Sequence, residues 1–318
     1  MVAAAPLRVV FFGTPSFAVP TLDALLGSRH RVVAVVTQPD RPRGRGQKTS
    51  DAPVKARAVA AGLPVFQPER MRDPGFVAGL SDLRADLGVV AAYGRILTET
   101  LLATPRLGMI NVHASLLPKY RGAAPVHRAV IGGERETGVT IMRVVKALDA
   151  GPMLASVTRP IGAEETSEDV ERDLARLGAD LLVATIEAML DGTAVETPQV
   201  ETEASYAPRL TREDGLVEWA RPAARIHDLV RGLYPWPHAC TFLAGRRFVL
   251  LKSVALDTGA DAAPGTIVRA EGDVLDVAAA PGIVRILSIQ PEGKRAMAVR
   301  EFLAGHHLRP GDRFTTHP

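Results

Sequence analysis

Apolar residues in the first two thirds of the chain fall into short, nearly continuous runs, and segments with apolar residues every three or four positions lie between them. The runs are typical of buried strands, and the spaced segments are typical of helices. Strands that alternate with helices predict an α/β fold with a mostly parallel sheet and helices on both faces. The expected strands are 7–12, 31–37, 64–66, 86–92, 108–112, 139–145 and 153–157, and the expected helices are 16–26, 52–61, 123–131 and 166–190.

Two helix starts carry capping signals. Thr166 and Asp169 have the spacing of a capping box ahead of the longest helix, and Ser16 is predicted to cap the first one. The turn before Ser16, Gly13-Thr14-Pro15, is not G-x-G-x-x-G, so the sequence has no dinucleotide fingerprint there.

The pattern changes near Asp191. Residues 191–209 are polar and aperiodic, which predicts a linker between a catalytic domain at 1–190 and a second domain at 210–318. Short strands separated by Gly and Pro turns predict an OB-like β-barrel in the second domain. These strands are expected near 241–243, 247–254, 265–269, 274–279 and 283–289, with helices at 221–232 and 296–304.

Composition sets the class of protein. A chain of 318 residues with 47% hydrophobic and 23% charged residues is ordinary for two globular domains. The single cysteine, Cys240, excludes a disulfide framework and fits a reducing compartment. No basic leader precedes the short first apolar run, and no run has transmembrane length, so we expect a soluble, cytoplasmic protein without a membrane partner.

Basic residues gather in one loop, although the net charge is only +3. The segment after the second expected strand contains Gly44 and Gly46 among its basic residues. Glycines allow movement and arginines contact phosphates, so this loop is a candidate for a polyanionic partner, while a solvated surface loop is the simpler alternative. The basic residues are Arg41, Arg43, Arg45 and Lys48.

Two polar side chains, Asn111 and His113, mark the end of the apolar run at 108–112. Side chains two positions apart on a strand point to the same face. The amide and the imidazole could therefore meet at the carboxyl edge of the sheet, where open α/β folds bind ligands. By itself, the pair is better explained as a hydrogen-bonded strand end.

Asp149 strengthens the catalytic interpretation. It lies in a loop after the expected strand 139–145, and we expect the fold to bring this loop to the same edge. A carboxylate beside His113 could hold the ring in one tautomer. The chain has no compact set of metal ligands, so we expect a site without metal.

Eight motifs make the chain resemble the methionyl-tRNA formyltransferases along nearly its whole length. The segment from 111 to 154 is specific to enzymes that use formyltetrahydrofolate, and the basic loop and the barrel narrow the resemblance to the tRNA enzymes. The motifs are GTPSFAVPTL (13–22), TQPDRPRGRGQK (37–48), APVK (52–55), AYGRIL (92–97), NVHASLLPKYRGAAP (111–125), TGVTIM (137–142), LDAGPML (148–154) and YPWP (234–237).

The resemblance implies a Rossmann-like formyltransferase domain and an OB-like tRNA-binding domain. It implies that 10-formyltetrahydrofolate donates a formyl group to the α-amine of methionine on initiator tRNA. Asn111, His113 and Asp149 match the family's catalytic positions. The folate would lie against the segment 115–118 and the segment 93–97. The cofactor-binding residues expected from these segments are Ser115, Leu116, Leu117, Pro118, Tyr93, Gly94, Ile96 and Leu97.

The tRNA is expected to contact the basic loop and the second domain. Arg45 matches the family's loop pattern best, and Lys294 and Arg295 form a basic patch in the second domain. We expect a monomer, because one chain supplies both domains. The alternatives are a formyltransferase or hydrolase for a small molecule, such as an amino sugar or glycinamide ribonucleotide, and a tRNA-binding protein without catalysis.

Overall fold

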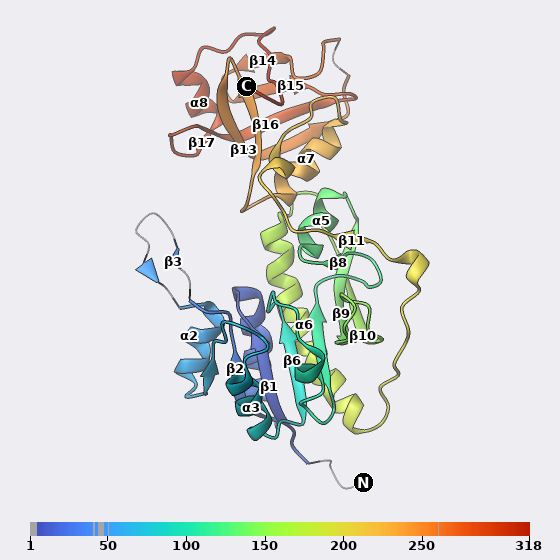
Figure 1. Cartoon of the computed structure of the whole chain (residues 1–318). Coiled ribbons are helices and arrows are strands. Elements are labelled where there is room, and N and C mark those ends of the chain that lie inside the picture. Colours follow the sequence, from blue (N-terminus) through green and yellow to red (C-terminus); the bar gives the residue numbers. More distant parts are fainter. Residues whose placement is uncertain (1–4, 41, 44–47, 50, 260) are drawn as a thin grey trace. The chain divides into compact units, whose positions relative to one another are not determined.

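The computed structural model describes residues 5–40, 42–43, 48–49, 51–259 and 261–318 (Figure 1). The chain forms two compact units, and each is assembled from separate segments. Unit 1 comprises Met1–Pro125, Glu136–Arg159 and Glu171–Ala207, and unit 2 comprises Val126–Arg135, Pro160–Val170 and Pro208–Pro318. Two short segments from the first part of the sequence therefore pack with the C-terminal residues. The domain limits at 190 and 210 remain predictions.

Unit 1 contains a seven-stranded sheet with the order β10-β9-β7-β6-β1-β2-β5. The pairs β1/β2, β1/β6, β6/β7 and β2/β5 are parallel, whereas β7/β9 is antiparallel. The predicted mostly parallel sheet is confirmed. Its strands are β1 (Arg8–Gly13), β2 (Arg31–Val36), β5 (Val65–Phe66), β6 (Leu87–Ala91), β7 (Met109–His113), β9 (Glu136–Arg143) and β10 (Met153–Pro160).

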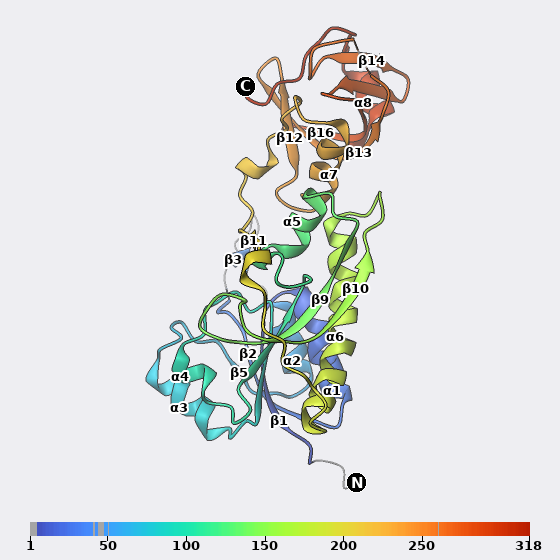
Figure 2. The same ribbon diagram turned by 90° about the vertical axis from the view of Figure 1, so that its right-hand side faces the viewer.

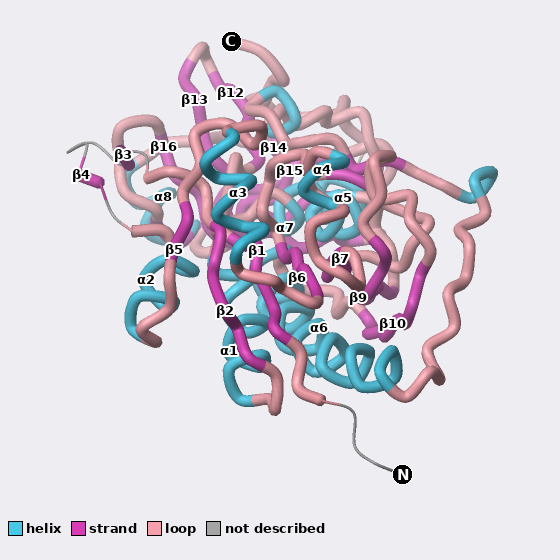
Figure 3. Tube along the Cα trace, turned by 60° about the horizontal axis from the view of Figure 1, so that its bottom comes forward, coloured by secondary structure: helices cyan, strands magenta, loops and turns pink. Residues whose placement is uncertain are grey.

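Helices cover both faces of this sheet, so its inner strands β1, β2 and β6 are buried along nearly their whole length. Figures 2 and 3 show α3 (Pro74–Asp82) and α4 (Glu99–Leu102) on one face, and α1 (Val19–Gly27) and α6 (Ser167–Leu190) on the other. Two further helices are α2 (Pro53–Ala60) and α5 (Pro125–Ile131). The core beneath α3 and α4 includes Val10, Phe12, Val36, Phe76, Leu80 and Leu101, all fully or nearly fully buried.

Helix ends test the capping predictions. Thr166 and Asp169 form the expected capping box: the amide of each residue donates to the other's side-chain oxygen, at 3.1 and 3.3 Å. The Ser16 prediction is wrong. Ser16–Ala18 form a 3-10 turn, and α1 begins at Val19 after Ala18, whose side chain cannot accept a hydrogen bond.

Two pairs of short strands lie outside the main sheet. β3 (Pro42–Arg43) pairs antiparallel with β4 (Lys48–Thr49) in the basic loop. β8 (Arg121–Gly122) pairs in parallel with β11 (Tyr206–Ala207). The predicted linker thus contains a strand that pairs with a segment of unit 1.

Unit 2 contains the second sheet, with the order β12-β13-β16-β15-β14 and β17 paired to β16. All its described pairs are antiparallel, and the five predicted strands are present. Two helices, α7 (Ala223–Gly232) and α8 (Val299–Gly305), accompany the sheet. Its strands are β12 (Ala239–Leu243), β13 (Arg246–Leu256), β14 (Ile267–Glu271), β15 (Val274–Ala278), β16 (Ile283–Pro291) and β17 (Met297–Ala298).

Residues 311–315 bridge the two outer strands of this sheet. Phe242 of β12 and Thr315 exchange backbone hydrogen bonds of 2.9 and 2.8 Å. On the other side, the Ile267 amide of β14 donates to the Asp312 carbonyl at 2.8 Å. The backbone of 311–315 therefore fills the gap between β12 and β14, which closes the sheet on itself as an OB-like barrel requires.

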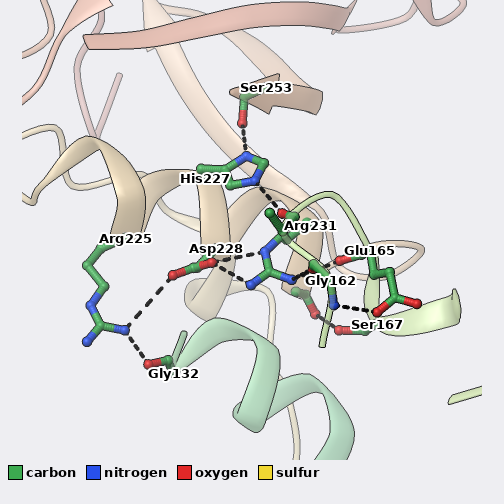
Figure 4. A network of polar contacts seen from close by, with 11 residues as sticks. Gly132, Gly162, Glu165, Ser167, Arg225, His227, Asp228, Arg231 and Ser253 are labelled. Carbon is green, nitrogen blue, oxygen red and sulfur yellow. Dashed lines mark hydrogen bonds and ion pairs between the residues drawn. The ribbon is translucent and has the colours of Figure 1, made fainter. Parts of the chain in front are cut away.

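A polar network connects two segments of unit 2, 126–135 and 160–170, to α7 (Figure 4). The buried Arg231 pairs with Asp228 at 2.7 Å, and it also donates to the carbonyls of Gly162 and Glu165 at 3.2 and 3.0 Å. Arg225 donates to the carbonyl of Gly132. These charged side chains explain why 126–135 and 160–170 belong to unit 2.

Within the described ranges, every helix lacks the combination of length and apolar character that a bilayer crossing demands.

Candidate active site

Asn111 and His113 lie on β7 in the middle of the unit 1 sheet. Asn111 is opposite Val90 of β6 and Met142 of β9, and His113 is opposite Thr140. Their spacing on a strand places both side chains on one face. His113 is buried, with 5% of its surface exposed, and Asn111 is half-buried. The side-chain amide of Asn111 has no hydrogen-bond partner among the described residues, so it is available to a ligand.

The two ring nitrogens of His113 have different neighbours. Nε2 lies 3.0 Å from the carbonyl oxygen of Tyr120. A carbonyl oxygen only accepts hydrogen bonds, so Nε2 must carry a proton. Nδ1 is therefore the nitrogen that gains or loses a proton. Tyr120 holds this carbonyl in place with φ of +61°, a left-handed conformation that is uncommon for a residue with a side chain.

Asp149 faces the other nitrogen of the ring. Its Oδ2 atom lies 3.8 Å from His113 Nδ1, which is within ion-pair range and too long for a hydrogen bond. The same oxygen accepts a hydrogen bond of 2.8 Å from the Gly122 amide. Asp149 also has a positive φ, +47°. The carboxylate is thus fixed by the backbone while it faces an imidazole that can become charged.

The loop with Asp149 reaches this position by an unexpected course. We expected it to emerge at the carboxyl edge of the sheet, but β9 is antiparallel to β7, and Arg143 at its end pairs with Ile110 near the start of β7. The loop must therefore return along the sheet before Asp149 meets His113 at the end of β7. The predicted proximity holds, and the predicted route was wrong because strand direction is not encoded in the apolar pattern.

The segment expected to contact folate, 115–118, is pinned to β9. Thr140 Oγ1 donates to the Ser115 carbonyl at 2.8 Å and accepts from the Leu117 amide at 3.2 Å. Ser115 itself is buried, and its hydroxyl donates to the Lys119 carbonyl at 2.6 Å. Leu116 and Pro118, the other two expected residues, are half-buried.

The second expected folate segment, 93–97, combines buried and exposed positions. Tyr93 is buried, which raises the pKa of its hydroxyl to about 12, and its carbonyl accepts from Gln38 Nε2 at 2.7 Å. Leu97 is buried as well. Gly94 is exposed, with φ of +76°, and Ile96 exposes 80% of its surface.

Three exposed apolar side chains lie on two loops that an ion pair joins: Ile96, and Val145 and Leu148 of the loop that carries Asp149. Lys146 and Glu99 form an ion pair of 3.1 Å, which brings the loop after β9 to the start of α4. Two apolar residues of that loop, Val145 and Leu148, are exposed, by 39% and 58%. Exposed apolar side chains beside polar catalytic groups are typical of a small-molecule site.

The expected tRNA contacts are only partly described. Arg41 and Arg45 lie outside the described residues, and of Arg43 and Lys48 the structure gives only the backbone pairing of β3 with β4. Lys294 is exposed in the turn after β16, and Arg295 next to it pairs with Glu301. All six assignments stay predictions.

Sequence reasoning missed the backbone groups that organise the site. The Tyr120 carbonyl and the Gly122 amide carry no side-chain signature, and the nearest signal in the sequence is Gly122 itself, because glycine allows unusual backbone conformations such as its φ of +119°. The described ranges contain no group of three or more His, Cys, Asp or Glu side chains arranged to hold a metal ion.

Comparison with known families gives two matches that together span most of the chain. Residues 7–186 match the model of the formyl transferase family, and residues 209–307 match the model of the formyl transferase C-terminal domain. The first match contains β7, the Asp149 loop and both segments expected to contact folate.

Similar proteins cover the chain almost completely. It is 44% identical to a methionyl-tRNA formyltransferase of Thermodesulfovibrio yellowstonii over 95% of this chain and 97% of that protein. It is also 44% identical to one from Caldanaerobacter subterraneus over 96% and 99% of the two chains. Among solved structures, the sugar 3N-formyl transferase WlaRD, crystallised in the presence of dTDP and 5-N-formyl-THF, superposes with a TM-score of 0.68 at 16% identity, covering 92% of this chain and 100% of WlaRD. At that identity the likeness concerns the fold.

Proposed function

The chain belongs to the methionyl-tRNA formyltransferases within the formyl transferase family, and we propose that it transfers a formyl group to the methionine of initiator Met-tRNA. The donor is 10-formyltetrahydrofolate, and the product is N-formylmethionyl-tRNA for translation initiation. The observation that carries the proposal is the His113–Asp149 pair, assembled beside a free amide in a chain with nearly full-length relatives of that name.

The chemistry required is attack of the α-amine on the formyl carbon. A bond forms between the amine nitrogen and that carbon, and the bond from the carbon to the folate nitrogen breaks. The formyl oxygen gains negative charge on the way. The free amide of Asn111 can donate a hydrogen bond to this oxygen. A preorganised donor of this kind contributes roughly 10²–10³-fold in rate.

His113 and Asp149 account for the protons. Because Nε2 donates to Tyr120, a proton gained by the ring resides on Nδ1, between His113 and Asp149. Nδ1–H is then a second donor for the formyl oxygen, and the carboxylate stabilises the charged ring. The attacking amine loses one proton to this pair, and the folate nitrogen receives one as it leaves, so the exchange balances.

The apolar surface next to Asp149 fits the folate. Ile96, Val145 and Leu148 expose hydrophobic area on two loops joined by an ion pair, and a flat pterin ring would cover it. The donor lies next to the catalytic groups if the ring rests there, because Asp149 directly follows Leu148.

The tRNA component of the proposal rests on the basic loop and on the relatives. We place Arg41, Arg43, Arg45 and Lys48 at the acceptor end of the tRNA, with Lys294 and Arg295 on its flank. Contacts of this kind weaken with salt. An Arg45→Ala variant should therefore raise the KM for tRNA more at 50 mM than at 200 mM salt, because salt already weakens the lost contact in the wild type, and should leave the KM for the folate unchanged.

The decisive experiment measures transfer of labelled formyl from 10-formyltetrahydrofolate to charged tRNA. Initiator Met-tRNA should be formylated, and elongator Met-tRNA should react far more slowly. An Asn111→Ala variant should keep its fold and lose roughly 10²–10³-fold in kcat. Formylation of an amino sugar or of glycinamide ribonucleotide instead of tRNA would favour the small-molecule alternative, for which the solved structures support the fold alone.

We further propose that the enzyme acts in the cytoplasm as a monomer, since one chain supplies both the catalytic residues and the second domain. Light scattering of the purified chain tests this, and a dimer mass at micromolar concentration would contradict it.

A further inference from the structure

Gln199 connects the two loops that hold the catalytic pair. Its side-chain Nε2 donates to the carbonyls of Asp149 and Gly151, both at 2.8 Å. Its Oε1 accepts from Nε of Arg121 at 3.0 Å. A single amide therefore uses both of its donors on the loop of Asp149 and its acceptor on the strand β8.

Gln199 thus links Asp149 to Arg121, and each of these residues lies next to atoms that position the His113–Asp149 pair. Asp149 faces His113 and has the positive φ of +47°, which the surrounding structure must impose. Arg121 stands between Tyr120, whose carbonyl accepts from His113, and Gly122, whose amide donates to Asp149. A shift of either end of the Gln199 bridge would move one partner relative to the other.

Further hydrogen bonds attach the segment that follows Gln199 to β8 and to Tyr120, which precedes it. The amide of Tyr120 donates to Ser205 Oγ at 2.9 Å, and the amide of Arg121 donates to the Ser205 carbonyl at 2.8 Å. Arg121 also pairs with the exposed Glu201 at 2.9 Å. Residues 199–207 thus form a strap, anchored at several points along the turn that contains the His113 acceptor.

Arg121 is buried to an extent that stability does not explain. Its side chain is 2% exposed, and its Nη2 atom has no hydrogen-bond partner within the described residues. Burying a guanidinium with an unpaired donor costs free energy, and an apolar side chain would avoid that cost. We therefore interpret the buried Arg121 as a residue that fixes the position of its neighbours rather than one that adds stability.

We propose that Gln199, together with Arg121, is a positioning residue that sets the distance between His113 Nδ1 and the Asp149 carboxylate. This inference rests on the proposed formyl transfer and assigns it a residue some fifty positions beyond the catalytic loop. Gln199 touches neither substrate. It acts through Asp149, and misplacement of a catalytic group by about 1 Å costs roughly 10²-fold in rate.

The test compares two variants at the half-buried Gln199 with one at an exposed position of the strap. Gln199→Leu keeps the approximate size and removes all three hydrogen bonds. Gln199→Glu keeps the acceptor for Arg121 but places a carboxylate oxygen against two carbonyls, so the loop of Asp149 loses its anchor. Thr202→Ala changes an exposed residue of the same strap and is the matched control.

We expect Gln199→Leu and Gln199→Glu to lower kcat roughly 10- to 100-fold, with the KM for both substrates within about twofold of wild type. Thr202→Ala should match wild type. The effect should vanish in an Asp149→Asn background, because a residue that acts through the carboxylate adds nothing once the carboxylate is gone.

Two results would overturn the inference: wild-type kcat in either folded Gln199 variant, or an undiminished loss from Gln199→Leu in the Asp149→Asn background. If Gln199→Leu does not fold, Gln199→Glu decides alone. Absence of formyl transfer by the wild-type chain would instead reject the proposed function, so the two failures are distinguishable.

Discussion

At the scale of single residues, the roles of the catalytic groups follow from which backbone atoms they touch. The Tyr120 carbonyl assigns the proton on His113 Nε2, and the Gly122 amide orients Asp149. Asn111 keeps its amide free. Asn111 and His113 Nδ1 therefore remain available to a substrate, while Asp149 acts on the His113 ring.

Asp149 offers a test that separates charge from shape. Asn also tolerates a positive φ and can accept from the Gly122 amide, so Asp149→Asn should fold normally. It removes the negative charge that faces His113, and we expect kcat to fall roughly 10²–10⁴-fold. Steady-state kinetics and a melting curve check this. The exposed Asp257, changed to Asn, is the control, and a kcat within threefold of wild type would contradict the assignment.

The sequence predicted this site incompletely for physical reasons. Asn111 and His113 could be paired from their spacing on one strand. Asp149 was proposed from its loop after the expected strand 139–145, and the resemblance then matched it to a catalytic position. The Tyr120 carbonyl and the Gln199 bridge could not be found from the sequence. Every residue has a backbone carbonyl, and the partners of Gln199 lie 48 to 78 positions away in the chain.

At the scale of elements, the strands were predicted well and two helices were missed. α3 and α4 are short, but their N-caps were readable: the side chains of Asp73 and Thr98 accept from Phe76 and Leu101, and Pro74 follows Asp73. The direction of β9 was not readable, because parallel and antiparallel strands share one apolar period.

The contacts that His30 makes with Leu7 and with Glu187 of α6 should make the free energy of unfolding depend on pH. The side chain of His30, the residue before β2, is fully buried. Its Nδ1 accepts from the Leu7 amide at 3.2 Å, and its Nε2 lies 3.1 Å from Glu187 of α6. Burial lowers the pKa of this imidazole, and Glu187 opposes the effect only in part. The unfolded chain then binds a proton that the folded chain resists, so stability should fall as the pH drops below about 6.5.

Urea unfolding at pH 7.5 and 5.5 measures this dependence. His30→Asn supplies an oxygen for the Leu7 amide and cannot be protonated. The decrease in unfolding free energy on acidification should be smaller in the variant, by at most about 1.4 kcal/mol per pH unit. Equal decreases in both proteins would show that His30 contributes nothing to the slope.

At the scale of the whole molecule, two units each depend on segments that are distant in the sequence. In unit 2, residues 311–315 close the barrel, and Phe314 enters its core. The ring of Phe314 stacks on Trp219 at 5.9 Å and meets Phe248 edge-on at the same distance. The closing segment thus contributes apolar packing as well as backbone hydrogen bonds.

Phe314→Ala should lower the unfolding free energy of unit 2 by about 3–5 kcal/mol, because a ring that is 1% exposed leaves a cavity. Trp219 fluorescence during denaturation reports the change. His317→Ala, at an exposed position three residues further on, should have no measurable effect. A loss below 1 kcal/mol in Phe314→Ala would mean that the segment is dispensable for closure.

Closure by residues 311–315 has a consequence for how the protein is made. The ribosome synthesises residues 311–315 after all the strands of the barrel. In a nascent chain, β12 and β14 are therefore unpaired edge strands until this segment has been made. Bare edges recruit strands from other chains. Transcripts cut short before this segment should therefore yield aggregates, and a chaperone that shields strand edges would have its greatest effect during that interval.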